Sequence, residues 1–295
     1  MAKILITGAE GFVGLNLAKA LLKAGYQIKG TDLVERKNFP ASQQFIQGNL
    51  NDKSFSDSLL DDVDGVIHLA GVSRAGEGRR DPVACAQANV MASVNICQGI
   101  CGQQRKMWLI LGSTREVDQL QKQAAAESLN DFYAISKQAM EDMASSFAQE
   151  GCFPVLIMRL SDVYGVDNDH QGKLLPNFVK LAKAGETLEV RNNSILFYYT
   201  HILDVIDAFL DGIASFENNP APIEIRRIWS DEGISIQGLA ELVCKATSSA
   251  SKISLSITDD GQESNRKKLT KSDTSGGLWS FEPKIDLAAG IKSML

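Results

Sequence analysis

Residues 3–14 read Lys-Ile-Leu-Ile-Thr-Gly-Ala-Glu-Gly-Phe-Val-Gly, an apolar run that leads directly into a glycine-rich turn. The helical pattern of Leu15–Ala24 follows without a gap. Glycines allow a tight turn and let the backbone approach a pyrophosphate, and the helix N-terminus supplies amide donors and a partial positive charge. Although the spacing is GxxGxxG rather than GxGxxG, this context predicts a dinucleotide-binding turn rather than one without a ligand. The predicted contacts are Gly8, Gly11, Phe12, Val13 and Gly14.

Apolar runs alternate with amphipathic helical patterns through the first half of the chain. The predicted strands are Lys3–Thr7, Gln27–Thr31, Gln44–Gln47, Gly65–Leu69, Met107–Leu111 and Pro154–Arg159. Buried runs rich in Ile, Leu and Val, separated by helical segments such as Asp131–Glu150, are typical of parallel β-α-β winding with both faces of the sheet covered. We therefore expect an α/β fold, a Rossmann-type doubly wound parallel sheet with a small C-terminal substrate-binding cap.

The pattern changes after Gly165 to longer loops, with a helical segment near Leu175–Ala184. Residues 1–165 are expected to form the cofactor-binding domain, and a later segment near residues 195–215 to return to it. Residues 166–295 are expected to form mainly the cap.

Composition narrows the possible partners. The chain has 295 residues with 44% hydrophobic and 22% charged side chains, which is the balance of an ordinary soluble protein. A net charge of −6 argues against nucleic acid or an anionic membrane as the main partner. Five cysteines without a CxxC pair and only three histidines predict neither a disulfide framework nor a metal site. A reduced, cytoplasmic setting is expected, with Cys97 and Cys101 as buried thiols.

An acidic residue follows the second predicted strand. Asp32 lies 18 residues after Gly14, where a carboxylate can accept hydrogen bonds from the adenosine ribose hydroxyls and repel a 2′-phosphate. This favours NAD over NADP. Arg36 and Lys37 lie close enough to weaken that preference, and a solvated loop is the alternative role for them.

Tyr133 and Lys137 form a YxxxK pair on a predicted helix, so both project from one face. The preceding predicted strand runs into Gly112-Ser113-Thr114, at the sheet edge where ligands bind in open α/β folds. A hydroxyl, a phenol and an ammonium that converge there would form a proton-transfer site. The ammonium would lower the pKa of the phenol from about 10 towards the working pH. A surface Tyr–Lys pair is the alternative.

With these motifs the sequence resembles the extended short-chain dehydrogenases/reductases, in particular the NAD-dependent epimerase/dehydratase group that acts on nucleotide sugars. Further matching segments are His68-Leu69-Ala70-Gly71, Asp81-Pro82 with Asn89-Val90, Gly48-Asn49-Leu50, Arg159–Gly165, and Leu175-Pro176-Asn177-Phe178 with Gly185-Glu186. The resemblance covers nearly the whole chain.

The resemblance implies hydride transfer at C4 of a nucleotide diphosphate sugar. Tyr133 would be the acid/base, Lys137 would hold the nicotinamide ribose, and Thr114 would hydrogen-bond the sugar oxygen. Further cofactor contacts would be Asn49, Leu50, Leu69, Ala70, Gly71, Asn89 and Leu160. The resemblance also implies a homodimer through the YxxxK helix, with which the apolar residues Ala139, Met140, Met143 and Phe147 are compatible.

Departures from the family pattern concern the substrate. Asp162 replaces the usual Asn near the diphosphate, where a carboxylate would repel a dianion unless it is protonated or turned away. Phe197-Tyr198-Tyr199 replaces the usual Arg-Asp-Phe, so a phosphate-binding arginine is missing. The candidate replacements are Lys173, Arg191 and Arg266, and Asn177 is a further substrate candidate.

Glu116 leaves the reaction type open. The family's 4,6-dehydratases carry an acidic residue just after the catalytic threonine, but its decarboxylases and 4-ketoreductases also carry Glu there. The short interval between Thr114 and Tyr133 favours an NAD-dependent epimerase or 4-ketoreductase. A dehydratase or decarboxylase that uses Glu116 is one alternative, and a non-catalytic NAD(P)-sensing protein on the same fold is another.

Overall fold

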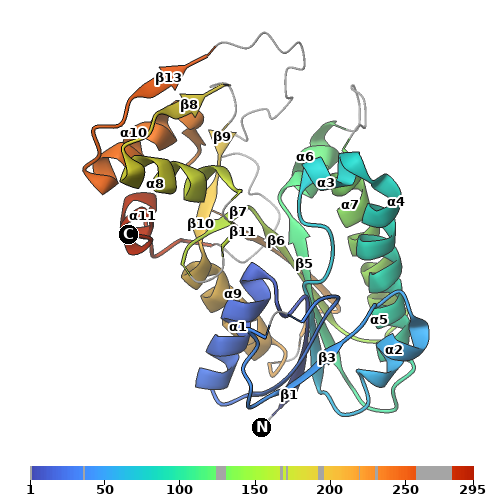
Figure 1. Cartoon of the computed structure of the whole chain (residues 1–295). Coiled ribbons are helices and arrows are strands. Elements are labelled where there is room, and N and C mark those ends of the chain that lie inside the picture. The colour runs from blue at the N-terminus through green and yellow to red at the C-terminus, as the bar shows by residue number, and fades with distance from the viewer. Residues whose placement is uncertain are drawn as a thin grey trace. The chain divides into compact units, whose positions relative to one another are not determined.

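The computed structural model describes residues 2–35, 37–123, 131–166, 169–170, 172–191, 196–218, 220–229, 232–256 and 281–295. The chain divides into two compact units (Figure 1). The first comprises Met1–Leu160 and Ile206–Arg227, and the second comprises Ser161–Val205 and Ile228–Leu295. The segment that returns to the first unit therefore begins within one helix and brings a further strand with it.

A seven-stranded sheet in the order β11-β6-β5-β4-β1-β2-β3 forms the centre of the first unit. Its strands are β1 (Lys3–Thr7), β2 (Gln27–Asp32), β3 (Gln44–Gln47), β4 (Gly65–His68), β5 (Trp108–Thr114), β6 (Val155–Leu160) and β11 (Ile223–Ile228). The pairs from β3 through β6 are all parallel. The order reverses beside β1, because β2 pairs with one edge of it and β4 with the other. The six predicted strands are therefore confirmed.

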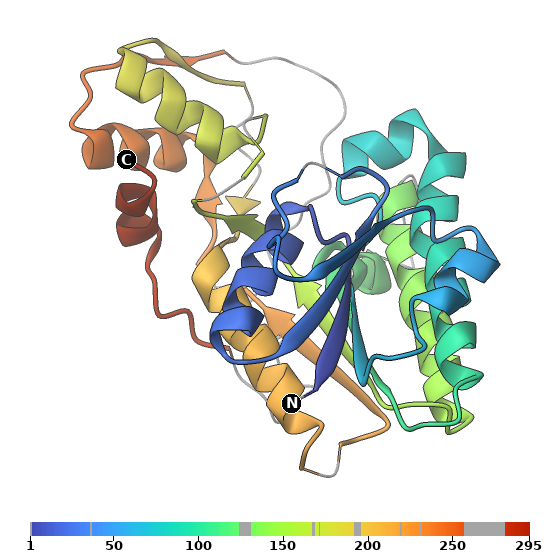
Figure 2. The same ribbon diagram turned by 60° about the horizontal axis from the view of Figure 1, so that its bottom comes forward.

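Helices cover both faces of this sheet. They are α1 (Phe12–Lys23), α2 (Lys53–Ser58), α3 (Ala75–Arg80), α4 (Pro82–Ala86), α5 (Ala92–Cys101), α6 (Glu116–Gln123), α7 (Phe132–Gln149) and α9 (Ile202–Ser215), with a π-helical turn at Gln87–Met91 between α4 and α5. Figures 1 and 2 show α1 and α9 on one face and α5 and α7 on the other. The central strands β1, β4, β5 and β6 are mostly apolar because both of their faces are buried, and Ile4, Leu5 and Ile6 are all fully buried.

One hydrophobic cluster joins the sheet to α5 and α7. It includes Leu5, Val66, Leu109 and Ile157 from the strands and Ile96, Cys97, Met140 and Ala144 from the helices. The cluster holds α7 against β5, and therefore fixes the YxxxK residues relative to the end of that strand.

The cysteines differ from the sequence expectation in one respect. Cys97 is a buried thiol, as predicted, but Cys101 forms a disulfide with Cys152. The partners lie 51 positions apart in the chain, at the end of α5 and in the turn after α7, where their Cα atoms are 4.9 Å apart. Sequence spacing could not indicate this pair, because the packing of α5 beside α7 creates the proximity.

The second unit contains helices and short strand pairs. Its helices are α8 (Leu174–Ala184), α10 (Ile236–Thr247) and α11 (Leu287–Ser293). Its strands pair as β10 (Tyr199–His201) with β7 (Asp162–Tyr164), β12 (Ile234–Ser235) with β9 (Leu196–Phe197), and β13 (Ile253–Leu255) with β8 (Leu188–Val190). A separate core that includes Tyr164, Leu175, Phe178 and Leu239 holds these elements together. Among the described residues, no helix is long and apolar enough to cross a membrane.

Candidate active site

The glycine-rich turn between β1 and α1 is packed backbone against backbone. Gly8 has a φ of +66°, and a Cβ there would lie 2.8 Å from the amide nitrogen of Ala70. A Cβ on Gly14 would lie 2.3 Å from the carbonyl oxygen of Gly8. No larger residue fits these two positions without movement of the main chain, and Gly14 itself lies in the first turn of α1. This cradle suits a pyrophosphate.

Asp32 ends β2 beside this turn. Its Oδ2 accepts a hydrogen bond from the backbone N–H of Glu10 at 3.0 Å, and its Oδ1 accepts one from Leu33 at 2.8 Å. The predicted ribose-binding carboxylate therefore lies next to the glycine-rich turn. Lys37 is exposed and has a φ of 61°, while Arg36 lies outside the described residues.

The turn after β4 meets the first turn through Thr7. The hydroxyl oxygen of Thr7 accepts hydrogen bonds from the backbone N–H groups of Leu69 at 3.2 Å and Ala70 at 3.1 Å. Gly71 follows with a φ of +146°, and a Cβ there would lie 2.3 Å from Oδ1 of Asn89. That oxygen is buried and accepts no hydrogen bond from the described residues. An unfilled acceptor in this position is a candidate contact for a bound group.

His68 links these turns to the π-helical segment. Ser93 donates its hydroxyl proton to the carbonyl oxygen of Asn89 at 2.6 Å, so it accepts at 2.9 Å from Nε2–H of His68. Nδ1 of His68 is then unprotonated and accepts from the hydroxyl of Thr7 at 2.7 Å. Burial, together with the charge of Lys137, lowers the pKa of His68 to about 3. His68 is therefore a neutral structural link between these segments.

Thr114 and Tyr133 meet at the carboxyl end of β5. Both are buried, at 5% and 7% exposure. The hydroxyl of Thr114 donates a hydrogen bond to the carboxylate of Glu116 at the start of α6. The predicted hydroxyl–phenol pair and the candidate carboxylate are therefore in one place.

The phenol differs from the sequence expectation in its charge state. Burial raises the pKa of Tyr133 well above its ordinary value, and the charge of Glu116 raises it further. A hydrogen bond with Thr114 opposes these two effects. The predicted lowering by Lys137 is wrong, because Nζ of Lys137 donates instead to the carbonyl oxygen of Gly112 at 3.0 Å.

Lys137 itself is buried at 6% exposure on the same face of α7 as Tyr133. Burial lowers the pKa of Lys137 to about 8, against the raising effects of Glu141 and Cys85. The ammonium is therefore mostly charged at neutral pH but close to its titration range. A cation of this kind can stabilise a phenolate or hydrogen-bond a ribose.

A buried ion-pair network joins the middle of α7 to β5 and β6. Glu141 receives hydrogen bonds from Ser113 and from the guanidinium of Arg159, whose Nη2 lies 2.5 Å from Oε2. Arg159 also contacts Asp118 at 2.6 Å, and Arg227 contacts the same carboxylate at 2.9 Å. Each buried charge has an opposite partner, which is the condition under which such charges are tolerated.

The remaining predicted cofactor residues differ in how far their side chains are buried or already hydrogen-bonded. The side chain of Leu50 belongs to the hydrophobic core, and its carbonyl oxygen accepts from Ser56 and Asn95. Asn49 accepts a hydrogen bond from the backbone N–H of Asn51 at 3.0 Å. Leu160 is partly exposed at the end of β6, opposite Thr114 in the strand register. Phe12 and Val13, in the first turn of α1, are also partly exposed.

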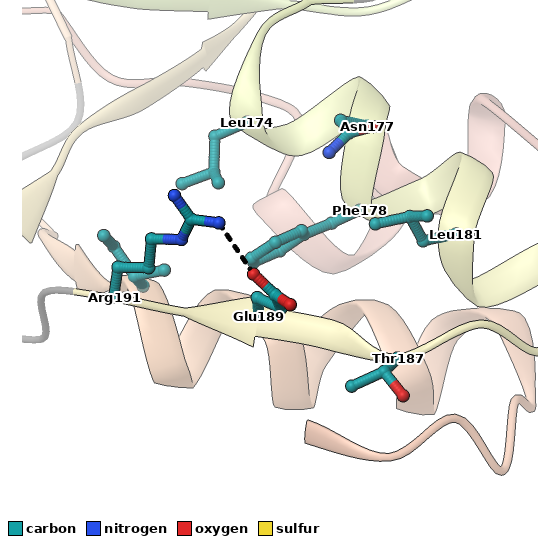
Figure 3. A pocket seen from close by; sticks show the side chains of 8 residues that line it. Leu174, Asn177, Phe178, Leu181, Thr187, Glu189 and Arg191 are labelled. Atoms are coloured by element: carbon teal, nitrogen blue, oxygen red, sulfur yellow. Dashed lines mark hydrogen bonds and ion pairs between the residues drawn. The ribbon is translucent and has the colours of Figure 1, made fainter. Parts of the chain in front are cut away.

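A separate pocket lies in the second unit, with a volume of about 480 Å³. Its lining residues come from α8, β8 and their flanks, and from α10: Leu174, Asn177, Phe178, Leu181, Thr187, Glu189, Arg191 and Ile236 (Figure 3). Nη2 of Arg191 lies 2.9 Å from Oε2 of Glu189 at the rim. Two of the predicted substrate residues, Asn177 and Arg191, therefore share one pocket.

The other substrate candidates do not line this pocket. Lys173 pairs with Asp169 at 2.6 Å and donates to the carbonyl oxygen of Val163 at 2.9 Å. Asp162 accepts a hydrogen bond from the backbone N–H of Tyr198 at 3.2 Å, which gives its carboxylate a structural role. Arg266 lies outside the described residues.

Sequence reasoning did not single out Glu10 or Glu189. Glu10 lies between the glycines of the turn, and only 1% of its surface is exposed. A carboxylate in such a turn is itself a signal, because buried charges require specific partners. Glu189 carries no comparable signal, since alternate polar residues are ordinary in a strand.

Known proteins resemble this chain in sequence. A model of the NAD dependent epimerase/dehydratase family matches residues 4–225. The UDP-N-acetyl-alpha-D-glucosaminuronate decarboxylase of Bacillus cytotoxicus is 27% identical over 272 residues, which cover 85% of this chain and 82% of that protein. The dTDP-D-glucose 4,6-dehydratase of Homo sapiens is 26% identical over 99% of this chain and 89% of that protein.

A solved structure shares the fold. The UDP-glucuronic acid 4-epimerase of Bacillus cereus, in complex with UDP-glucuronic acid and NAD, aligns with a TM-score of 0.80. The alignment covers 99% of this chain and 97% of that one at 21% identity. At this identity the likeness establishes the Rossmann-like fold rather than the reaction.

Proposed function

The chain belongs to the NAD-dependent epimerase/dehydratase family, and on that premise we propose that it is an NAD-dependent epimerase or 4-ketoreductase acting at C4 of a nucleotide diphosphate sugar. The observation that carries the proposal is the placement of Thr114, Tyr133 and Lys137 at the carboxyl end of β5, in the same unit as the glycine-rich turn. These groups supply a hydroxyl, an acid/base and a cation where ligands bind in such folds.

The residues of the first unit fit NAD. Gly8 and Gly14 allow a close backbone packing that a Cβ would disrupt, the unfilled Oδ1 of Asn89 lies beside Gly71, and Asp32 lies next to the glycine-rich turn. When bound, NAD would accept a hydride from the sugar and return one to it. The other proposed contacts are Gly11, Phe12, Val13, Asn49, Leu50, Leu69, Ala70 and Leu160.

Tyr133 is the proposed acid/base. In the oxidative direction it takes the proton of the C4 hydroxyl while the hydride leaves C4, and in the reductive direction it returns that proton to the C4 oxygen. Thr114 hydrogen-bonds the same oxygen and fixes its position. Lys137, a buried cation on the same face of α7, is the proposed contact of the nicotinamide ribose.

The second unit is the proposed substrate-binding part. Its pocket has apolar walls from α8 and α10 and polar side chains at Asn177 and Arg191. An arginine at such a rim can pair with a diphosphate, and the apolar walls can hold a base. Lys173 and Arg266 remain weaker candidates for the diphosphate.

Dehydration or decarboxylation is a second candidate, supported by Glu116. Its carboxylate receives the hydrogen bond of Thr114, so a second base lies beside the proposed acid/base. Two of the relatives described above carry the names of a decarboxylase and a dehydratase. These reactions begin with the same oxidation at C4.

The first test is mass spectrometry of small molecules released from freshly purified protein, followed by incubation with a panel of nucleotide sugars. A product of unchanged mass indicates epimerisation, and loss of water or of carbon dioxide indicates the second candidate. A 4-keto sugar reduced with consumption of NADH indicates a ketoreductase. Tyr133→Phe should abolish turnover and keep NAD binding. Unchanged biological activity of that variant would instead support an NAD(P)-sensing protein.

We also propose a homodimer formed through α7. Phe132, Ile135 and Met143 of this helix expose 45%, 36% and 46% of their surface, and Val83 in neighbouring α4 exposes 67%. Met140, by contrast, is buried in the core. Light scattering after size-exclusion chromatography should give twice the mass of the chain, and Ile135→Glu should halve it.

A further inference from the structure

Glu10 is a buried acid within the cofactor turn. It lies between Ala9 and Gly11, and 1% of its surface is exposed. Its backbone N–H donates to Oδ2 of Asp32 at 3.0 Å. The backbone of Glu10 therefore contacts the carboxylate that ends β2.

The side chain of Glu10 holds the segment that follows Asp32. Its Oε1 accepts hydrogen bonds from the backbone N–H groups of Asn38 and Phe39, each at 3.2 Å. Lys37, just before these two residues, takes a left-handed conformation. The carboxylate thus fixes the backbone of Asn38 and Phe39 beside the glycine-rich turn.

Packing of its ring also holds Phe39 in place. The ring of Phe39 lies over Gly30, where a Cβ would be 2.6 Å from the ring, and it contacts Phe45 with ring centroids 5.5 Å apart. Leu33 and Val34 remain exposed at 59% and 52% on the same segment. Apolar side chains are therefore exposed next to Asp32, which suits the adenosine end of a dinucleotide.

The two acids affect NAD and NADP differently. A ribose with free hydroxyls can donate hydrogen bonds to carboxylates, whereas a 2′-phosphate carries about −1.5 to −2 charges and is repelled by them. Hydrogen bonds from backbone N–H groups orient Asp32 and Glu10 without cancelling their charge. The nearby cation of Lys37 is exposed, so solvent and salt screen it more than they screen a buried carboxylate.

We infer that Glu10 is a second determinant of NAD over NADP: its charge acts with Asp32 to repel the 2′-phosphate, and its hydrogen bonds hold Asn38 and Phe39 in place for the adenosine of either cofactor. The inference rests on the proposed binding of NAD. It assigns two separable contributions to one side chain, its charge and its hydrogen bonds to Asn38 and Phe39.

Two substitutions separate these contributions. Glu10→Gln keeps an acceptor for Asn38 and Phe39 but removes the charge, and Glu10→Asp keeps the charge but is too short for both hydrogen bonds. Dissociation constants for NAD and NADP would be measured by calorimetry on the full chain after removal of bound nucleotide. Thermal unfolding of each variant verifies that it is folded.

Glu10→Gln should lower the ratio of the NADP to the NAD dissociation constant about tenfold, equivalent to about 1.4 kcal/mol, with NAD affinity nearly unchanged. Glu10→Asp should weaken both cofactors and leave the ratio close to that of the wild type. An unchanged ratio in Glu10→Gln would overturn the inference.

Asp32→Asn provides a test that does not depend on replacing Glu10. If Glu10 acts as inferred, this variant retains part of its preference for NAD. Complete loss of preference in Asp32→Asn would assign all discrimination to Asp32. This result would overturn the inference about Glu10 but leave the proposed function standing. A wild-type chain that binds neither dinucleotide would overturn the proposed function together with it.

Discussion

The hydroxyl of Thr114 donates its hydrogen bond to the carboxylate of Glu116, two residues further along the chain. The same carboxylate raises the pKa of Tyr133, after the larger effect of burial. Glu116 therefore influences both groups that are proposed to contact the sugar oxygen, even if it exchanges no proton with the substrate itself.

Replacing Glu116 with Gln should shift the pH profile of the reaction. Removal of the negative charge lowers the pKa of Tyr133, and Tyr133 must be deprotonated to act as a base. The rising limb of kcat/KM in the oxidative direction should therefore move to lower pH, with a change in maximal rate of less than about tenfold.

Glu150→Gln, at the exposed end of α7, is the matched control and should leave the profile in place. A loss of about a thousandfold or more in Glu116→Gln would contradict the epimerase or ketoreductase proposal. It would show that the carboxylate transfers a proton, as dehydration requires.

His68 should make the protein sensitive to acid. Burial, followed by the charge of Lys137, lowers the pKa of His68 to about 3, whereas an unfolded histidine titrates near 6.5. Between these values the unfolded chain binds more protons, so the free energy of unfolding falls as pH falls from about 6.5 to about 3, by roughly 4 kcal/mol in all.

His68→Gln should weaken this dependence, although it lowers stability at neutral pH by disturbing the hydrogen bonds to Thr7 and Ser93. Chemical unfolding at a series of pH values measures the slope. His170→Gln, in an exposed position, is the control and should keep the wild-type slope. An equal slope in His68→Gln and the wild type would show that other groups cause the acid sensitivity.

The sequence was sufficient for six of the seven strands of the sheet and for the cofactor turn because these follow from local rules, but not for β11, which lies beyond the segment expected to return to the sheet. The β1 run is apolar on both faces, and the glycines that follow it leave no doubt about a tight turn before α1. Thr114, Tyr133 and Lys137 could also be found, since strand ends and helix faces place residues at known spacings.

Long-range contacts explain what the sequence could not show. The Cys101–Cys152 disulfide depends on the packing of α5 beside α7, and the raised pKa of Tyr133 depends on burial and on the position of Glu116. The partner of Asp162, the backbone N–H of Tyr198, likewise lies 36 residues away in the chain. In each case the residue type suggested a chemical role, but the partner that controls it was distant or unspecified in sequence.

Opening the disulfide should destabilise the first unit. Closing a loop of 51 residues reduces the entropy of the unfolded chain, worth about 4 kcal/mol in a chain-entropy model. The double variant Cys101→Ser/Cys152→Ser should therefore unfold at a lower temperature than the wild type, and a reducing agent should lower the Tm of the wild type but not of the variant.

Cys244→Ser, which replaces a thiol that forms no disulfide, is the control and should respond to reductant as the wild type does. Titration of free thiols before and after reduction checks the pairing directly. A wild-type Tm that does not change on reduction would contradict a stabilising disulfide, and would agree with the reduced setting expected from the sequence.

Gly14→Ala should distinguish the steric effect of an added Cβ on the glycine-rich turn from the effect of alanine on helix propensity. Alanine favours a helix over glycine by about 1 kcal/mol, so propensity alone predicts a stabilised α1. A Cβ at this position, however, would lie 2.3 Å from the carbonyl oxygen of Gly8, so the turn must move to accommodate it. We expect NAD affinity to fall at least about tenfold, because the displaced turn no longer presents its amides to the pyrophosphate.

Gly76→Ala is the matched control in α3, where nothing lies within 4 Å of the added Cβ. It should raise the free energy of unfolding by about 0.4–1 kcal/mol and leave NAD affinity unchanged. Calorimetry and thermal unfolding on the two variants measure both quantities. If Gly14→Ala bound NAD as well as Gly76→Ala does, the pyrophosphate would not depend on the close contact between Gly8 and Gly14, and the turn would have to bind its ligand in another way.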